Sequence, residues 1–121
     1  MTKIQNSKQY DLEDRTYNFA KRVRDFIKSV PKSITNIENC RQLTRSSGSV
    51  GANYIEANES LSKKDFILRI KICRKEAKES RYWLKLIDMG NDKNLERECN
   101  YLIKEVGELM NIFGSIIHKS E

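Results

Sequence analysis

Apolar residues recur at alternating intervals of three and four in four successive segments of the chain, and this periodicity constrains the fold more than any other feature. A side chain repeated at this interval returns to the same side of an α-helix, so each segment predicts an amphipathic helix with one face to bury. The four apolar faces are Leu12, Thr16, Phe19, Val23, Phe26 and Val30; Ile37, Cys40, Leu43 or Thr44, Ser47, Val50, Tyr54, Ala57 and Leu61; Phe66, Ile70, Cys73, Ala77, Ser80, Leu84 and Ile87; and Leu95, Cys99, Leu102, Val106, Leu109, Phe113 and Ile116, the last face widened by Ile103, Met110 and Ile117. Four such helices joined by short loops predict an all-α protein, an antiparallel up-down-up-down four-helix bundle.

The first two helices are expected to begin at capping residues. Asp11 with Asp14 three residues later resembles a capping box, in which side chains accept hydrogen bonds from the free amides of the first turn. Pro31 ends this helix because proline cannot continue the backbone hydrogen bonds. Thr35 with Glu38 predicts the start of the second helix in the same way.

The third helix has the best defined start. Ser62 and Asp65 form a capping box, and Leu61 just before the cap is placed to pack on Phe66 as a hydrophobic staple. Gly90 is placed to adopt the left-handed conformation that ends a helix.

The chain has 121 residues, enough for one domain with one core. Residues 1–10 are polar and predict a flexible arm, and residues 11–121 predict a single four-helix bundle domain. A charged fraction of 33% with one proline and five glycines favours long helices. No apolar run is long enough to span a membrane and the polar start is unlike a secretory signal, so we expect a cytoplasmic protein that does not bind membranes.

The three cysteines and the one histidine do not suggest a metal site. Cys40, Cys73 and Cys99 lie on the apolar faces of different helices without CxxC spacing, so we expect buried small side chains rather than disulfides or ligands. His118 falls in the last turn of the fourth helix, where free carbonyls favour a cation. Bundle di-iron sites need two Glu-x-x-His pairs. We therefore expect no metal, no cofactor, no small-molecule substrate and no enzymatic activity.

The middle of the second helix carries few large apolar side chains. Gly48 and Gly51 each cost about 1 kcal/mol of helix propensity relative to alanine, so packing must hold this segment helical. Beside the apolar face lies a stripe of small and polar residues that would let another helix approach closely: Arg45, Ser49, Ala52, Asn53 and Glu56. We expect Ala52 to face other helices. Glu56 and Asn53 could suggest acid or base chemistry, but we expect Glu56 to be a structural carboxylate paired with Arg45 or with an arginine of the third helix.

RSSGSVGANYIEAN at residues 45–58, followed by LSKKDF and later by ESRYWLKLI, resembles the bacterial four-helix bundle proteins first noticed as reading frames in intervening sequences of 23S ribosomal RNA genes. The resemblance covers nearly the whole chain, and its core motif is Arg45, Ser46, Ser47, Ser49, Ala52, Asn53 and Glu56. It implies an antiparallel bundle, often a homopentamer, without established enzymatic activity. A related bundle, the accessory variability determinant of diversity-generating retroelements, is a basic pentamer that works with a reverse transcriptase and RNA. The kinship therefore implies RNA or a reverse transcriptase as a possible partner.

Most of the net charge of +6 falls on the predicted third helix. Residues 62–89 hold nine Lys and Arg against four Asp and Glu, whereas residues 92–118 hold three against five. The regular members of this basic stripe are Lys64, Lys71, Arg74, Lys78, Arg81 and Lys85. Such a stripe can follow the phosphates of RNA or DNA, and the chain has no RNA-recognition motif or zinc finger that would read bases. A purely structural scaffold or protein–protein assembly module, with the lysines serving solvation, is the alternative.

The other flank of the third helix mixes acidic with large apolar residues: Ile72, Glu76, Glu79, Trp83 and Leu86. Its apolar area is large for a monomer, and tryptophan commonly anchors interfaces. Because the two flanks differ, they suit a head-to-tail contact that closes a ring. We expect a cyclic homo-oligomer, with five subunits favoured by the resemblance, that leaves the basic stripe at least partly free.

Overall fold

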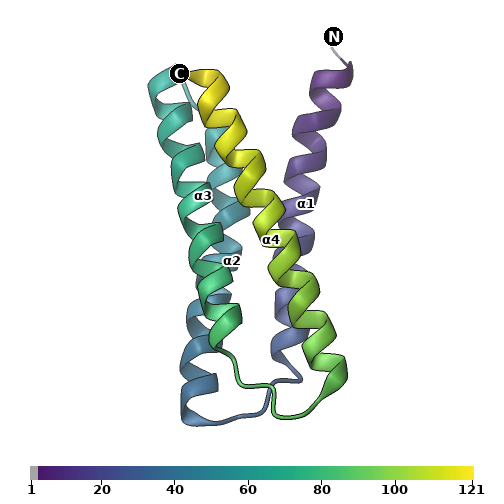
Figure 1. Cartoon of the computed structure of the whole chain (residues 1–121). Helices are drawn as coiled ribbons and strands as arrows, with labels where there is room; N and C mark the ends of the chain where they lie inside the picture. Colours follow the sequence, from purple (N-terminus) through teal and green to yellow (C-terminus); the bar gives the residue numbers. More distant parts are fainter. Residues whose placement is uncertain (1–2) are drawn as a thin grey trace.

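The computed structural model describes residues 3–121, with side chains from Leu12 onward. It consists of four helices: α1 (Lys3–Ile27), α2 (Ile34–Asn58), α3 (Lys63–Leu86) and α4 (Lys93–Ser120). Figure 1 shows them as long rods lying side by side, with the beginning of α1 and the end of α4 at the same end of the molecule. Each helix packs on its neighbours in sequence and α1 also meets α4, so the four surround one core. The all-α prediction is confirmed, since residues 3–121 contain no strand.

The core is built from the predicted apolar faces. Every predicted member of the α1 face from Leu12 to Val30 is buried, and the α4 face is buried from Leu95 to Phe113. Two predicted members of the α2 face are wrong. Ile37 is 48% exposed. Leu61 is 98% exposed, because α2 ends at Asn58 and the turn that follows carries Leu61 into solvent. The predicted staple between Leu61 and Phe66 is therefore wrong as well.

The helix start agrees with the sequence in α3 and differs in α1 and α2. The Ser62 hydroxyl accepts from the Asp65 amide at 3.0 Å, as predicted. The cap of α2 is Ser33, whose hydroxyl accepts from the amide of Asn36, instead of Thr35. Ser33 precedes Thr35 and has the extended backbone that a cap requires.

Helix α1 begins at Lys3, well before the predicted cap at Asp11. Good helix formers such as lysine and glutamine precede Asp11, so the helix continues through it. Residues 1–2 of the predicted arm lie outside the described residues, and residues 3–10 of it belong to α1.

At its other end, α3 stops at Leu86, and Gly90 stands in the loop that follows. Gly90 has the predicted left-handed conformation, with φ of 63°, but it does not end the helix, because the C-cap of α3 is Ile87. Asn36 fixes this loop from α2 and is itself buried. Its side-chain amide donates to the carbonyls of Pro31 and Asp88 at 2.9 and 2.8 Å, and its oxygen accepts from the Asp88 amide at 3.0 Å.

The motif residues of α2 hold it against α3. The hydroxyls of Ser46 and Ser80 lie 2.8 Å apart in the core, and both side chains are fully buried. The Arg69 guanidinium donates to the Asn53 oxygen at 3.1 Å, while the Asn53 amide donates to the Ser49 carbonyl and hydroxyl. These polar contacts explain much of the motif as a structural element.

Two expectations for this segment are wrong. Glu56 is exposed, and among the side chains from Leu12 onward no ion pair involves it. Arg45 lies eleven residues earlier, roughly 16 Å along the helix axis, which puts it out of reach. Ala52 is exposed on the outer side of α2. The close approach occurs at Gly51 instead, where a Cβ atom would lie 2.9 Å from the Thr16 hydroxyl of α1.

Candidate nucleic-acid interface

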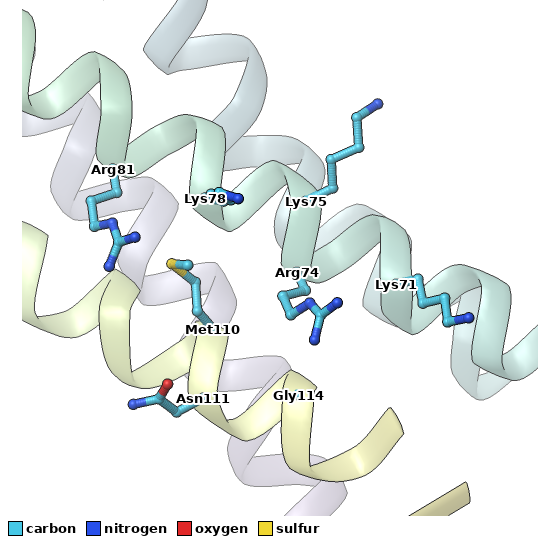
Figure 2. Close-up of a pocket in the computed structure, with 8 residues that line it drawn as sticks. All are labelled: Lys71, Arg74, Lys75, Lys78, Arg81, Met110, Asn111 and Gly114. Carbon is cyan, nitrogen blue, oxygen red and sulfur yellow. The ribbon is translucent and has the colours of Figure 1, made fainter. Parts of the chain in front are cut away.

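A groove runs between α3 and α4 on the basic side of the molecule and has a volume of about 560 Å³. Figure 2 shows the residues that line it, five cations of α3 facing three uncharged residues of α4. They are Lys71, Arg74, Lys75, Lys78, Arg81, Met110, Asn111 and Gly114. The name "α3–α4 groove" refers to these eight residues below.

Part of the predicted basic stripe lies in this groove. Four of its members line the groove, namely Lys71, Arg74, Lys78 and Arg81. Lys64 and Lys85, at the two ends of α3, do not line it. Sequence reasoning missed Lys75, although its spacing of four from Lys71 and three from Lys78 would have placed it on the same side of the helix. It also missed the wall from α4, because only the fold brings that helix opposite the stripe.

The two arginines and the lysines of the groove are placed differently. Figure 2 shows Arg74 and Arg81 reaching from α3 toward α4, whereas Lys75 points away from α4. A Cβ atom on Gly114 would lie 3.5 Å from Nη1 of Arg74, an ordinary van der Waals distance, so the guanidinium lies close to α4 at this position. Arg81 is half-buried, whereas Arg74 is exposed, as are Lys71 and Lys78.

Three acidic residues of α4 contact arginines of α1 and not the cations of the groove. Arg15 contacts Glu105 at 2.8 Å and Glu108 at 2.6 Å, and Arg22 contacts Glu98 at 2.6 Å. Hydrogen bonding to Glu105 raises the pKa of Arg15 above its usual value, so this guanidinium is a permanent cation. The carboxylates of α4 that could neutralise the groove are therefore engaged on the opposite side of the helix.

The acidic residues of α3 are engaged on the α2 side. Nη2 of Arg45 lies 3.2 Å from Oε1 of Glu76 and 2.9 Å from Oε1 of Glu79. Glu76 is only 7% exposed, and its Oε1 atom is held by charge attraction without a well-directed hydrogen bond. Within residues 12–121, a groove cation takes part in one ion pair, which joins Lys71 to the Glu121 carboxylate at 3.7 Å. The groove therefore keeps almost all of its positive charge.

The predicted oligomer flank of α3 lies beside α2. Glu76 and Glu79 are partly enclosed by Arg45 of the same chain. Trp83 is partly buried against the core and its ring meets Tyr82 edge to face at a centroid distance of 5.0 Å. Leu86 remains 46% exposed. The apolar part of the flank that is free to contact another chain is thus smaller than the sequence suggested, and its role in assembly stays a prediction.

Cys73 and Cys99 are buried as predicted, and Cys40 is partly exposed. Burial raises the pKa of Cys73 to about 12 and that of Cys99 to about 11. Between Leu12 and Glu121, no group of histidine, cysteine and acidic side chains has the arrangement of a metal site. None of the four helices has an apolar stretch long enough to cross a membrane.

Comparison with known proteins places the chain in a family. The family described as 23S rRNA-intervening sequence protein matches residues 8–115. A solved structure from Bacteroides thetaiotaomicron, described as a protein of unknown function from the S23 ribosomal protein family, shares 28% identity with a TM-score of 0.72. The match covers 87% of this chain and 96% of that one. No curated protein matches the sequence. The extent of the family match shows that this chain belongs to the 23S rRNA-intervening sequence proteins.

Proposed function

We propose that this protein is a non-enzymatic nucleic-acid-binding bundle, which holds the phosphate backbone of RNA or DNA in the α3–α4 groove. The observation that carries the proposal is the separation of charge. Five cations line the groove, while Arg15, Arg22 and Arg45 engage the nearby acids of α3 and α4 on the other sides of these helices. Unneutralised cations on one surface attract a polyanion and release its condensed counterions on binding.

The chemistry of the lining favours backbone contacts over base recognition. None of the eight lining residues is aromatic, so the groove has no platform on which a base could stack. Asn111 is its one uncharged hydrogen-bonding side chain. Binding should therefore depend on charge and shape, with little dependence on sequence.

RNA is the favoured polymer because the family carries the name of a ribosomal RNA intervening sequence. An RNA partner would also fit a cytoplasmic protein. A protein partner that handles RNA, such as a reverse transcriptase, would act on the same basic side.

The proposed architecture is an antiparallel up-down-up-down bundle that assembles into a cyclic homo-oligomer. Short loops between successive helices and the contact between α1 and α4 support the antiparallel order. Exposed apolar side chains on α2 and α3 support assembly, among them Ile55, Leu68, Tyr82 and Leu86. The same residues favour the alternative function, a scaffold that assembles without nucleic acid.

Titration of a fluorescently labelled RNA with the unaltered protein, over a series of salt concentrations, tests the function. The proposal predicts binding at about 50 mM salt and an affinity that falls linearly with salt on a log-log plot. RNA and DNA of unrelated sequence should bind within a few-fold of one another. Absence of binding at this salt concentration would favour the scaffold.

A further inference from the structure

The arginines of this chain fall into two groups. All nine lie among the side chains that the structure describes. Seven have a side-chain partner of their own, a carboxylate or an asparagine: Arg15, Arg22, Arg24, Arg41, Arg45, Arg69 and Arg97. Within residues 12–121, Arg74 and Arg81 have no such partner, and both line the α3–α4 groove.

These two guanidinium groups also share an orientation. Figure 2 shows both of them turned toward α4, with Met110 between them. The Arg74 guanidinium lies close to Gly114 of α4, although its side chain is exposed, and Arg81 is half-buried. A guanidinium carries its donors in a rigid planar fork, and a fork aimed into a groove without a carboxylate is left with unused donors.

The spacing of the two forks indicates the class of ligand. Arg74 and Arg81 are seven residues apart, roughly 10 Å along the helix axis. In the arrangement of Figure 2 the two guanidinium groups lie on either side of Met110, so one phosphate group would not contact both. A chain of phosphodiesters offers an acceptor to each fork, whereas inorganic phosphate can occupy only one of them.

We propose that Arg74 and Arg81 are the residues that recognise phosphate geometry in the α3–α4 groove, each donating two hydrogen bonds to a different phosphodiester of one nucleic-acid strand. Lys71 and Lys78 then supply charge without a fixed geometry. This inference rests on the proposed function and assigns the recognition within it to two residues. Lysine keeps the charge of arginine but has no planar fork, so substitution separates the two contributions.

The test is fluorescence anisotropy with labelled RNA, using the full chain with Arg74→Lys and Arg81→Lys combined. Affinity should fall by about tenfold, as two double hydrogen bonds become single ones. The slope of affinity against salt should stay unchanged, because the number of cations does not change. The matched control is Arg24→Lys with Arg41→Lys, two exposed arginines outside the groove, which should bind like the unaltered protein. Circular dichroism should show equal helix content in all three proteins.

A second readout is the Nε–Hε signals of Arg74 and Arg81 in nuclear magnetic resonance spectra. Both should shift on addition of RNA, and inorganic phosphate at equal phosphate concentration should shift them weakly. Unchanged affinity of the Arg74→Lys, Arg81→Lys protein would overturn the inference and leave the proposed function standing. An equal loss in the control pair would overturn it too. If the unaltered protein does not bind RNA at all, the inference falls together with the proposed function.

Discussion

The Arg15 guanidinium of α1 donates to both carboxylate oxygens of Glu105 on α4, from Nε at 2.8 Å and from Nη2 at 3.0 Å. This bidentate ion pair stabilises the contact between the first and the last helix. It also turns a carboxylate of α4 away from the α3–α4 groove. The same pair thus contributes to the fold and to the distribution of charge on the surface.

The Arg15–Glu105 pair should contribute measurable coupling energy. Both side chains are partly buried, at 28% and 15% exposure, so solvent screens them less than a surface pair. A double-mutant cycle with Arg15→Met and Glu105→Gln, followed by urea unfolding, should give a coupling of about 0.5 to 3 kcal/mol. Additive effects of the two changes would show that the pair contributes nothing beyond its separate side chains.

Gly51 and Gly48 should respond in opposite directions to alanine. At Gly48 an added methyl group meets no atom within 4 Å, so Gly48→Ala should raise stability by about 0.5 to 1 kcal/mol through helix propensity. At Gly51 the methyl group would lie 2.9 Å from the Thr16 hydroxyl, so the helices must separate. Overpacking typically costs about 1 to 3 kcal/mol, so Gly51→Ala should lower the melting temperature. A rise in both variants would mean that α1 and α2 are less closely packed at this point.

The cysteines should differ in reactivity toward an alkylating reagent. The reactive species is the thiolate, and burial raises the pKa of Cys73 to about 12 and that of Cys99 to about 11. Burial also raises the pKa of Cys40, which is nevertheless partly exposed. Native protein at about pH 8 should therefore be modified at Cys40 alone, with unfolded protein in urea modified at all three. Mass spectrometry of the native reaction that shows Cys73 or Cys99 modified first would contradict the packing of the core.

The predicted ring should give a mass several times that of the 14.2 kDa chain in light scattering. Leu86→Glu places a charge on the exposed apolar part of the predicted flank and should dissociate the assembly while helix content is kept. Leu61→Glu is the control, since Leu61 is 98% exposed and lies outside the flank. A 14.2 kDa species for the unaltered protein would reject the ring, and a dimer would reject the head-to-tail contact.

The apolar periodicity was sufficient to predict the four helices and most of the core, because burial of a continuous face decides which residues pair across a bundle. Details that depend on how two helices pack against each other could not be predicted from periodicity. Glu56 and Glu76 are both acidic residues beside an apolar face, and only the packing of α2 on α3 shows that Arg45 reaches Glu76. Likewise, Ala52 and Gly51 are neighbours in sequence, and the rotation of α2 decides which one meets Thr16.

The candidate site was predicted in part. The spacing on α3 identified four of the five cations in the groove, because a helix places residues three and four apart on one side. The facing residues of α4 are Met110, Asn111 and Gly114. They carry no charge, and no pattern in the sequence marks them as part of a site. The pairing of the α4 acids with Arg15 and Arg22, which leaves the groove basic, follows from the tertiary structure alone.

We propose that nucleic acid binds in the α3–α4 groove and not through positive charge in general. The most direct measurement compares the salt dependence of RNA binding for Lys71→Gln with Lys78→Gln against that for Lys21→Gln with Lys32→Gln, a pair of exposed lysines outside the groove. Both double variants lose the same charge. The groove variant should bind more weakly, and its log-log slope should shrink by about 1.4 to 1.8, while the control keeps the slope of the unaltered protein. Equal losses in the two variants would contradict binding in the groove, because affinity would then follow net charge.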